Sequence, residues 1–477
     1  MPPKISKQSA PSVADVHLTN TLSGRLEKFE PIDPARVGLY VCGLTPYDST
    51  HLGHARCYVT FDLVRRTFEA AGYKLTHVQN FTDIDDKIIA RAKEKKMSPF
   101  ALATNFMEEY FEAIDPLNVL RAHHYPRVTQ HIREIVDLTD RLVKKGFAYP
   151  AENGDVYFAV ARFAGYGKLS KRNTEELLSG ARVEVSPHKK DPLDFALWKA
   201  SAEEGASWES PWGRGRPGWH IECSAMSSKY LGQPFDLHGG GQDLIFPHHE
   251  NEIAQSEAAQ DTPFARYFMH NGFVTVNKEK MSKSLGNFFS LKDIYKSFPP
   301  RVVRYYLLTE HYRRPLDFSD AALQEAAAAL SRLDEAAELL LFIGGTGKIS
   351  AAEAKSILKE KMLACLTRDF HSPSALALLQ EWAGRVFDAF KKRALSAEAA
   401  QQSLHEASAC ARSLLGIEFP ALPREHPKGA LALLHERERH RTGKKFQEAD
   451  AIRRRLLEEF GLLAEDTPYG PRLKNKN

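Results

Sequence analysis

The feature that most constrains the fold is a strand, helix and strand pattern near the N-terminus. The apolar run Val37 to Cys42 predicts a buried strand that ends in a glycine-containing loop. Leu52 to Ala71 repeats apolar residues at helical spacing, and Leu75 to Phe81 predicts a second strand. Two strands joined by a crossover helix form the unit of a parallel sheet. We therefore expect a Rossmann-type α/β domain, whose ligands bind beyond the carboxyl ends of the strands.

The remainder of the chain predicts further domains, since 477 residues suit about two to four of them. Helical and irregular pieces alternate from His131 to Trp212, which predicts an insertion into the sheet domain. The Ala- and Leu-rich segment Ala321 to Leu415 predicts a helical bundle, and two charged helices are expected at Ala430 to Arg441 and Phe446 to Phe460. The predicted boundaries are a flexible tail at 1–17, the sheet domain at 18–130 and 213–320, the insertion at 131–212, the bundle at 321–420 and a small C-terminal domain at 421–477.

Composition narrows the class of protein. The cysteines are scattered at positions 42, 57, 223, 365 and 410, which predicts a reducing compartment, the cytoplasm, rather than a disulfide framework. No run approaches the ~20 apolar residues of a membrane helix, so no membrane association is expected. The polar N-terminus lacks the apolar stretch of a signal peptide, and Asp15 with no arginine argues against a transit peptide. The net charge of +4 permits a polyanionic partner without requiring one.

Two histidines mark the start of the first predicted helix. His51 and His54 are three residues apart and therefore share one face of the first helical turn. A helix N-terminus offers backbone amides and a positive dipole end, and Gly53 permits the backbone of a ligand site to approach closely. This arrangement suits the phosphates of ATP. Taken alone, however, the pattern is better explained as a capped surface helix with two incidental histidines.

A second motif reads Lys280-Met-Ser-Lys283-Ser and is followed by a Leu-Gly-Asn turn. Two ammonium groups on a flexible loop can swing onto a polyphosphate and neutralise the charge that builds on leaving pyrophosphate. Alone, this motif is weak, because most short lysine clusters are solvated basic loops. Together and in this order, the two motifs resemble the signature of class I aminoacyl-tRNA synthetases. The first motif has Leu52 where many members have isoleucine, which is a conservative apolar exchange.

Two thiols, an imidazole and a carboxylate form a feasible zinc-binding set in this sequence. The candidates are Cys42, Cys223, His248 and Glu252. Pro247 is a plausible first helical residue, and the spacing of four would then place the histidine and the carboxylate on one face. His249 and Glu250 are expected to point elsewhere. By residue type alone, the cysteines are more commonly buried small hydrophobes and a His-x-x-x-Glu pair is more commonly a surface pair.

Four sequence blocks extend the resemblance to one family, the cysteinyl-tRNA synthetases, from about Leu18 to the C-terminus. In the order of that family, they are Gly38–Gly43, Gln79–Lys87, Gly218–Met226 and His238–Glu252. The resemblance implies that the four candidates bind one Zn²⁺ ion, which takes the substrate sulfur as a further ligand. It implies that Thr82 and Trp219 line the cysteine pocket and that Lys283 contacts ATP. The positions it matches to an adenosine-packing segment are His238, Gly239, Gly240, Gly241 and Asp243.

The resemblance implies an enzyme that activates L-cysteine with ATP, accompanied by Mg²⁺, and passes it to the 3′ end of tRNA(Cys). His51, His54, Lys280 and Lys283 would be the catalytic groups. A shape-based pocket separates cysteine from serine poorly, whereas zinc binds a thiolate strongly, so we expect selection by the metal without an editing domain. The family also implies a monomer, a stem-contact region within 213–320 and an anticodon-binding C-terminal domain.

The C-terminal helices offer cations for contact with tRNA, although interleaved acidic residues are equally typical of a solvated helix. The cations are Arg437, Arg439, Arg441, Lys444, Lys445 and Arg453 to Arg455. The family often has a tryptophan in its tail for base stacking, where this chain has Leu473, and Tyr469 is a candidate substitute.

Three alternatives remain open at this point. A cysteine ligase of the mycothiol pathway shares the zinc site and the ATP motifs, but it lacks the full C-terminal region that Ala430 to Lys476 represents here. A non-catalytic paralogue would usually have lost motifs that this chain retains. A nucleotide-binding sheet protein with a structural zinc ion is the third.

Overall fold

The computed structural model describes residues 13–171, 187–203, 205–277, 279–280, 288–345, 356–419 and 426–475. The chain divides into two compact units, which we describe separately. The first comprises 1–326, 363–375 and 414–416, and the second comprises 327–362, 376–413 and 417–477.

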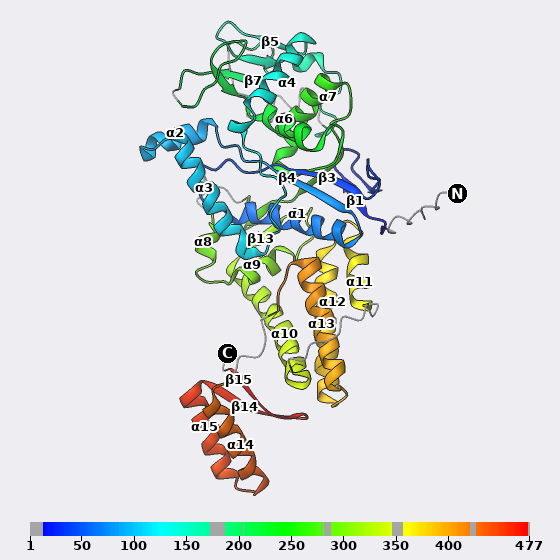
Figure 1. Cartoon of the computed structure of the whole chain (residues 1–477), viewed down its shortest axis with the longest axis vertical. Helices are drawn as coiled ribbons and strands as arrows, with labels where there is room; N and C mark the ends of the chain where they lie inside the picture. Colours follow the sequence, from blue (N-terminus) through cyan, green and yellow to red (C-terminus); the bar gives the residue numbers. More distant parts are fainter. Residues whose placement is uncertain are drawn as a thin grey trace, which may run out of the picture. The chain divides into compact units, whose positions relative to one another are not determined.

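A parallel four-stranded sheet, of which Figure 1 labels β3 and β4, forms the centre of the first unit. Its strand order is β10-β9-β3-β4. The strands are β3 (Arg36–Val41), β4 (Lys74–Gln79), β9 (Phe235–Gly241) and β10 (Ala265–Asn271). Helix α1 (Leu52–Ala70) is the crossover between β3 and β4. The predicted α/β fold with a parallel sheet is therefore confirmed, although β10 was not predicted.

Helices cover both faces of this sheet. Helix α1 lies on one face, and helices α6 (Trp219–Leu231) and α7 (Glu250–Gln260) lie on the other (Figure 1). Gly239 allows α1 to lie close, because a Cβ atom there would come within 2.2 Å of Phe61 Cε1. This layering places the start of α1 and the start of α7 at the carboxyl-end rim of the sheet, where ligands of such sheets bind.

The last residues of the predicted flexible tail, Ala14 and Val16 among them, instead pack on the sheet domain. Residues 1–12 of that tail lie outside the described residues. Ala14 N–H donates to the Ala71 carbonyl at 2.9 Å, and the side chain of Val16 is fully buried. The antiparallel hairpin of β1 (His17–Asn20) and β2 (Arg25–Lys28) follows.

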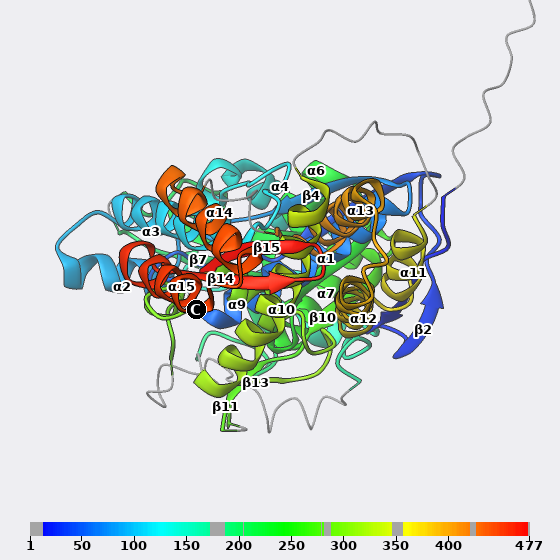
Figure 2. The ribbon, with the colours of Figure 1, turned by 90° about the horizontal axis from the view of Figure 1, so that it is seen from below.

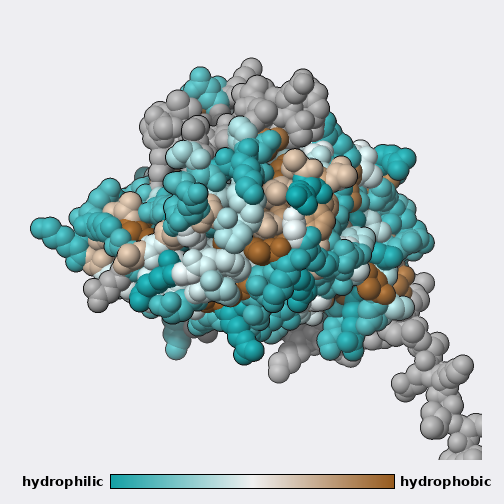
Figure 3. All heavy atoms as spheres, turned by 90° about the horizontal axis from the view of Figure 1, so that it is seen from above, coloured by the Kyte–Doolittle hydropathy of each residue, from teal (hydrophilic) through white to brown (hydrophobic). Residues whose placement is uncertain are grey.

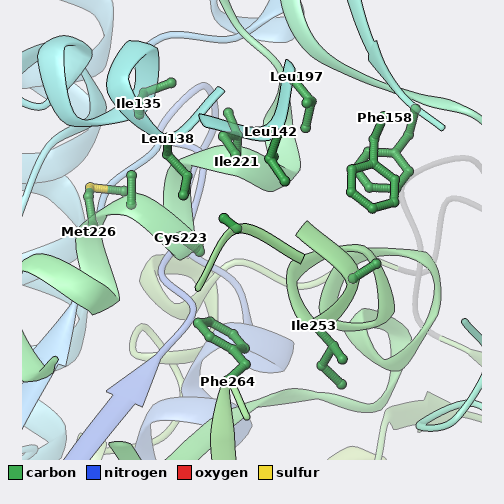
Figure 4. Packing of buried hydrophobic residues seen from close by; sticks show 14 of the residues in the cluster. Ile135, Leu138, Leu142, Phe158, Leu197, Ile221, Cys223, Met226, Ile253 and Phe264 are labelled. Carbon is green, nitrogen blue, oxygen red and sulfur yellow. The ribbon is translucent and has the colours of Figure 1, made fainter. Parts of the chain in front are cut away.

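Helices and a second sheet separate β4 from β9. The helices are α2 (Asp86–Lys95), α3 (Pro99–Ile114) and α4 (Ile132–Lys144). The second sheet is antiparallel and comprises β5 (Ala148–Pro150), β6 (Val156–Phe158), β7 (Phe195–Ala200) and β8 (Gly215–Pro217). Figure 4 shows Phe158 and Leu197 of this sheet beside Leu142 of α4 and Ile221 and Cys223 of α6, all in one apolar cluster.

A small sheet and two helices follow β10. The strands β11 (Val274–Val276), β12 (Glu279–Lys280) and β13 (Leu316–Phe318) are ordered β12-β11-β13, and the helices are α8 (Leu291–Ile294) and α9 (Pro300–Leu307). A buried ion pair between Asp62 of α1 and Arg304 of α9 joins the two helices. The helix that begins at the rim is thereby tied to the segment that follows the small sheet.

The second unit is mostly helical, as predicted. The helices that lie wholly or mostly in it are α10 (Asp320–Gly344), α11 (Ile357–Leu366), α12 (Ser372–Lys391), α13 (Ala397–Leu415), α14 (Lys428–Thr442) and α15 (Phe446–Phe460). The first four of them each have some residues in the first unit. The C-terminal residues, for which no strands were predicted, form the antiparallel hairpin of β14 (Leu462–Thr467) and β15 (Gly470–Asn475) beside α14 and α15 (Figure 2).

The surface is predominantly polar on the face drawn in Figure 3, where apolar side chains occur in small groups. Among the described residues, no helix has both the length and the apolar character needed to cross a membrane.

Candidate active site

A cavity of about 370 Å³ opens at the carboxyl-end rim of the central sheet. Its walls come from the loop after β3, the start of α1, the start of α6 and the turn after β9. Of the predicted site residues, the cavity is lined by Cys42, His51, Gly53, His54, Trp219, Gly241 and Asp243. The structure thus brings together residues that span some two hundred positions of sequence.

The two histidines of the first motif cap helix α1 reciprocally. His54 N–H donates to His51 Nδ1, and His51 N–H donates to His54 Nδ1, each at 3.3 Å. The two rings stack with their centroids 3.6 Å apart. Because each Nδ1 accepts a hydrogen bond, the neutral ring carries its proton on Nε2, which makes Nε2–H a donor. The cap therefore fixes the orientation and the tautomer of two donors at the cavity wall.

The lysine motif lies largely outside the described residues. The backbone of Lys280 belongs to β12, where it pairs with Thr275 of β11. The side chain of Lys280 and the whole of Lys283 are outside the described part of the chain, so their predicted roles stay predictions.

The four candidate metal ligands meet at one buried point behind the cavity. Their donor atoms all lie within 4.8 Å of one another. The Sγ atoms of Cys42 and Cys223 are 3.8 Å apart, and Glu252 Oε1 lies 3.6 Å from Cys42 Sγ and 2.7 Å from His248 Nε2. No side chain of the four is more than 5% exposed. Two sulfurs, an imidazole nitrogen and a carboxylate oxygen at one point make a plausible site for a soft or borderline metal ion.

Local structure explains how the four residues converge. Cys42 is held at the end of β3 by its N–H, which donates to the Gly239 carbonyl at 3.0 Å. Cys223 lies on α6, where Gly218 precedes the first helical residue. His248 lies in the turn Ile245–His249 that leads into α7, one helical turn before Glu252. The predicted shared face of His248 and Glu252 agrees with this arrangement.

The electrostatics of the cluster are strongly perturbed. The hydrogen bond from Cys42 lowers the pKa of Cys223 to about 6, while burial raises the pKa of the Cys42 thiol. Burial lowers the pKa of His248, but Glu252 and Cys223 outweigh it and raise the value to about 10. Burial likewise opposes ionisation of Glu252, yet the surrounding histidines hold its pKa well below the usual range. Metal ligands of these types must be deprotonated, so cation binding by such a group would release protons and depend on pH.

Two buried histidines that the sequence did not assign to the cluster lie against it. His249, expected to point elsewhere, places its Nε2 3.3 Å from Cys42 Sγ. His238 contacts the carboxylate of Glu252. With Cys42 and Glu252 they form a second, overlapping set of metal-ligand geometry. Glu250 does point away and accepts hydrogen bonds from the backbone N–H groups of Gly167, Leu169 and Ser170.

Of the two residues predicted to line the cysteine pocket, Trp219 lines the described cavity and Thr82 does not. Trp219 is 41% exposed, lines the cavity and stacks on the ring of His248 at 4.3 Å. Thr82 is buried and donates its hydroxyl to Glu222 Oε2 at 2.8 Å. Burial raises the pKa of Glu222 well above its ordinary value. Thr82 thus lies behind the described cavity wall rather than in it.

The glycine-rich end of β9 and the turn that follows it are split between the cavity and the core. Gly241 and Asp243 line the cavity, whereas His238, Gly239 and Gly240 are buried and are not among its described lining residues. This differs from the expectation that all five pack against adenosine. The reason is the position along the strand: Gly239 packs against Phe61 of α1 and Gly240 against His249 just before α7, and only the end of β9 at Gly241 reaches the cavity.

In the C-terminal hairpin and helices, several predicted tRNA contacts have protein partners. Arg437 is buried and forms two hydrogen bonds to Asp466, at 2.7 and 2.8 Å. Tyr469 stacks on Phe390 at 5.3 Å and donates its hydroxyl to the Leu395 carbonyl at 3.1 Å. Tyr469 is therefore engaged within the second unit, and the idea that it replaces the tail tryptophan gains no support.

Comparison with known proteins gives the family and the fold relatives of this chain. Residues 28–328 match the family of class I (C) tRNA synthetase catalytic domains. A cysteine–tRNA ligase of Moorella thermoacetica is 48% identical over 96% of this chain and 100% of its own length. One of Carboxydothermus hydrogenoformans is 50% identical over 95% and 99%. In fold, the chain is similar to a methionyl-tRNA synthetase of Mycobacterium tuberculosis bound by methionyl-adenylate (TM-score 0.60, 16% identity, 80% of this chain and 92% of that one).

Proposed function

The chain belongs to the cysteine–tRNA ligases, which are class I aminoacyl-tRNA synthetases, and we propose how its residues attach L-cysteine to tRNA(Cys). In this proposal, L-cysteine reacts with ATP to give cysteinyl-adenylate, and the 3′ end of the tRNA then takes the cysteinyl group. The protein is proposed to act as a cytoplasmic monomer, with Mg²⁺ accompanying ATP.

Cys42, Cys223, His248 and Glu252 are proposed to hold one zinc ion. The fit rests on donor chemistry: two thiols, an imidazole and a carboxylate, buried and within 4.8 Å of one another. A bound zinc ion supplies a Lewis acid that favours the thiolate of cysteine over the hydroxyl of serine. Cys42 lines the cavity and Trp219 covers His248 beside it, so the amino acid would enter on this side of the group.

The ATP end of the cavity is proposed to lie at the start of α1. His51 and His54 would donate from Nε2 to the phosphates, and Gly53 lets the nucleotide approach the helix N-terminus. Gly241 and Asp243 are proposed to hold the adenosine, since both line the same cavity. Lys280 and Lys283 would stabilise the charge that develops on pyrophosphate. The reaction then depends on positioning and electrostatics, with no protein nucleophile.

On the amino acid side, Trp219 is proposed to form the wall against which cysteine packs. Thr82 acts one layer further back, where it holds Glu222 through its hydroxyl. A buried carboxyl group left without this donor would be costly, so Thr82 supports the floor of the pocket.

The single observation that carries the proposal is the meeting of the four donor groups beside a cavity lined by both capping histidines. The test is to charge a tRNA mixture with each amino acid, before and after zinc is removed by a chelator. We expect only cysteine to be attached, and the attachment to cease on chelation and return with zinc. Charging that survives complete zinc removal, or equal charging with serine, would refute the proposed selection.

The ATP roles are tested separately by cysteine-dependent pyrophosphate exchange. His54→Ala and Lys283→Ala should each slow exchange by about a hundredfold or more, the usual effect of removing one charge-stabilising donor. Lys74→Ala is the matched control, because this exposed lysine lies at the amino end of β4, the opposite edge of the sheet. Near-normal exchange in both site variants would reject these roles.

A further inference from the structure

His238 is fully buried on β9, behind the proposed metal group, and faces an acceptor on each side. Its Nε2 contacts Glu252 Oε2, and its Nδ1 lies 3.2 Å from the carbonyl oxygen of Tyr40 on β3. Aromatic rings surround it, with Tyr40, Phe264 and Phe268 at centroid distances of 5.4 to 5.6 Å. The ring is therefore fixed in orientation by contacts on all sides.

The carboxylate of Glu252 is divided between two partners. Oε1 lies 2.7 Å from His248 Nε2 and 3.6 Å from Cys42 Sγ, whereas Oε2 faces His238. The two oxygens thus point to opposite sides, one into the donor group and one away from it. A carboxylate without a partner for its rear oxygen could rotate or turn both oxygens to the same cation.

Of the two overlapping ligand sets, the set that contains Cys223 and His248 meets the cavity at two of its members. Cys42 lines the cavity, and the ring of His248 is covered by the cavity residue Trp219. His249 is tied at the rear, because its Nδ1 lies 2.9 Å from His270 Nε2. A metal that admits a substrate needs an open position towards the substrate cavity. This requirement favours the set with Cys223 and His248 and leaves His238 as a support.

We propose that His238 is a positioning residue that holds Glu252 Oε2, so that Oε1 alone is presented to the metal. This inference rests on the proposed zinc site and gives His238 a role other than contact with adenosine. Hydrogen bonds to metal ligands commonly change metal affinity by about 10- to 100-fold. The role therefore predicts an effect on zinc retention and on cysteine, with ATP unaffected.

The test compares two replacements of similar length in the full chain, His238→Gln and His238→Met. Glutamine retains an N–H donor near the position of Nε2, and methionine does not. Zinc dissociation constants are measured by competition with a chromophoric chelator. We expect methionine to weaken zinc binding by about 10- to 100-fold and glutamine to stay within about threefold of the unchanged chain. KM for cysteine should rise in the methionine variant while KM for ATP stays constant.

His77→Met is the matched control, since His77 is also a buried histidine of the central sheet and makes no described contact with the donor group. Equal zinc affinity in the two His238 variants would overturn the proposal, as would equal weakening by His77→Met. A rise in KM for ATP alone would also overturn it and would restore the adenosine contact. If the methionine variant does not fold, weak zinc binding by the glutamine variant alone refutes the role.

The outcome is separable from a failure of the proposed function. An unchanged chain that binds no zinc, or that charges tRNA after zinc removal, refutes the proposed zinc site itself. An unchanged chain that binds zinc and needs it, together with a methionine variant of equal affinity, refutes only the role of His238.

Discussion

Replacement of His77 by leucine should make the first unit less sensitive to acid. The imidazole of His77 on β4 is 4% exposed, and neither ring nitrogen has a hydrogen-bond partner among the described residues. Burial, reinforced by the nearby Arg65 and His123, lowers the pKa of His77 to about 3. The protonated form is therefore excluded from the folded sheet throughout the mildly acidic range.

The sign and size of the effect follow from proton linkage. In the unfolded chain, a histidine has a pKa of about 6.5, so the unfolded state binds more protons than the folded state between about pH 6.5 and pH 3. Above about pH 6.5, protonation of His77 costs the folded state nothing. Below that pH, the unfolding free energy falls by ~1.4 kcal/mol for each pH unit. At pH 5.0 the cost reaches ~2 kcal/mol, which His77→Leu should remove.

The assay is urea denaturation of the unchanged chain and of His77→Leu between pH 7.5 and pH 5.0. The difference in unfolding free energy between the two proteins isolates His77 from other titrating groups. We expect this difference to shift by ~2 kcal/mol in favour of leucine as the pH falls. His124→Leu, a change at an exposed histidine, is the control and should produce no such shift. A difference that stays constant across the pH range would refute the reasoning.

Asp62→Asn breaks the buried ion pair with Arg304 and should destabilise the first unit by ~3–5 kcal/mol, measured by denaturation at neutral pH. The arginine outweighs burial and lowers the pKa of Asp62, so this stability exists above about pH 4 and is lost in stronger acid. Cys223→Ser should abolish stoichiometric zinc in metal analysis while leaving the circular dichroism spectrum unchanged; full zinc content would contradict the site. Tyr469→Phe should cost ~0.5–1.5 kcal/mol through the lost bond to Leu395 and leave the KM for tRNA unchanged. A large rise in that KM would show that the ring contacts RNA.

Where apolar residues repeat at helical spacing, the bounds of the helix could be predicted to within a residue or two. The helix expected at Leu52 to Ala71 is α1 (Leu52–Ala70), and that at Phe446 to Phe460 is α15. Strand β10 was missed although six of its seven residues are buried. The hairpin of β14 and β15 was missed because its sequence is polar and contains proline and glycine. The register of the hairpin, in which Leu462 pairs with Asn475, is set by contact between the two strands and not by a pattern within either strand.

The donor types of the site could be predicted, but the surroundings of the donors could not. The spacing predicted that His248 and Glu252 lie together because residues four apart share one face of a helix. The position of His249 depends on the turn Ile245–His249, in which Phe246 has extended backbone angles. No periodic pattern describes such a turn, so the contact of His249 with Cys42 lay beyond sequence reasoning.

The three glycines after His238 serve both helix packing and the cavity wall. A Cβ atom on Gly239 would lie 2.2 Å from Phe61 of α1, and one on Gly240 would lie 3.1 Å from His249 Cε1, just before α7. These two glycines therefore let helices on opposite faces approach the same strand, and only Gly241 reaches the cavity. Because His51 caps α1, His54 lies on α1 and Glu252 lies on α7, the close approach brings the proposed ATP end and the metal group to one rim. Gly239→Ala should thus displace α1 and slow pyrophosphate exchange, although no atom of Gly239 lines the described cavity wall.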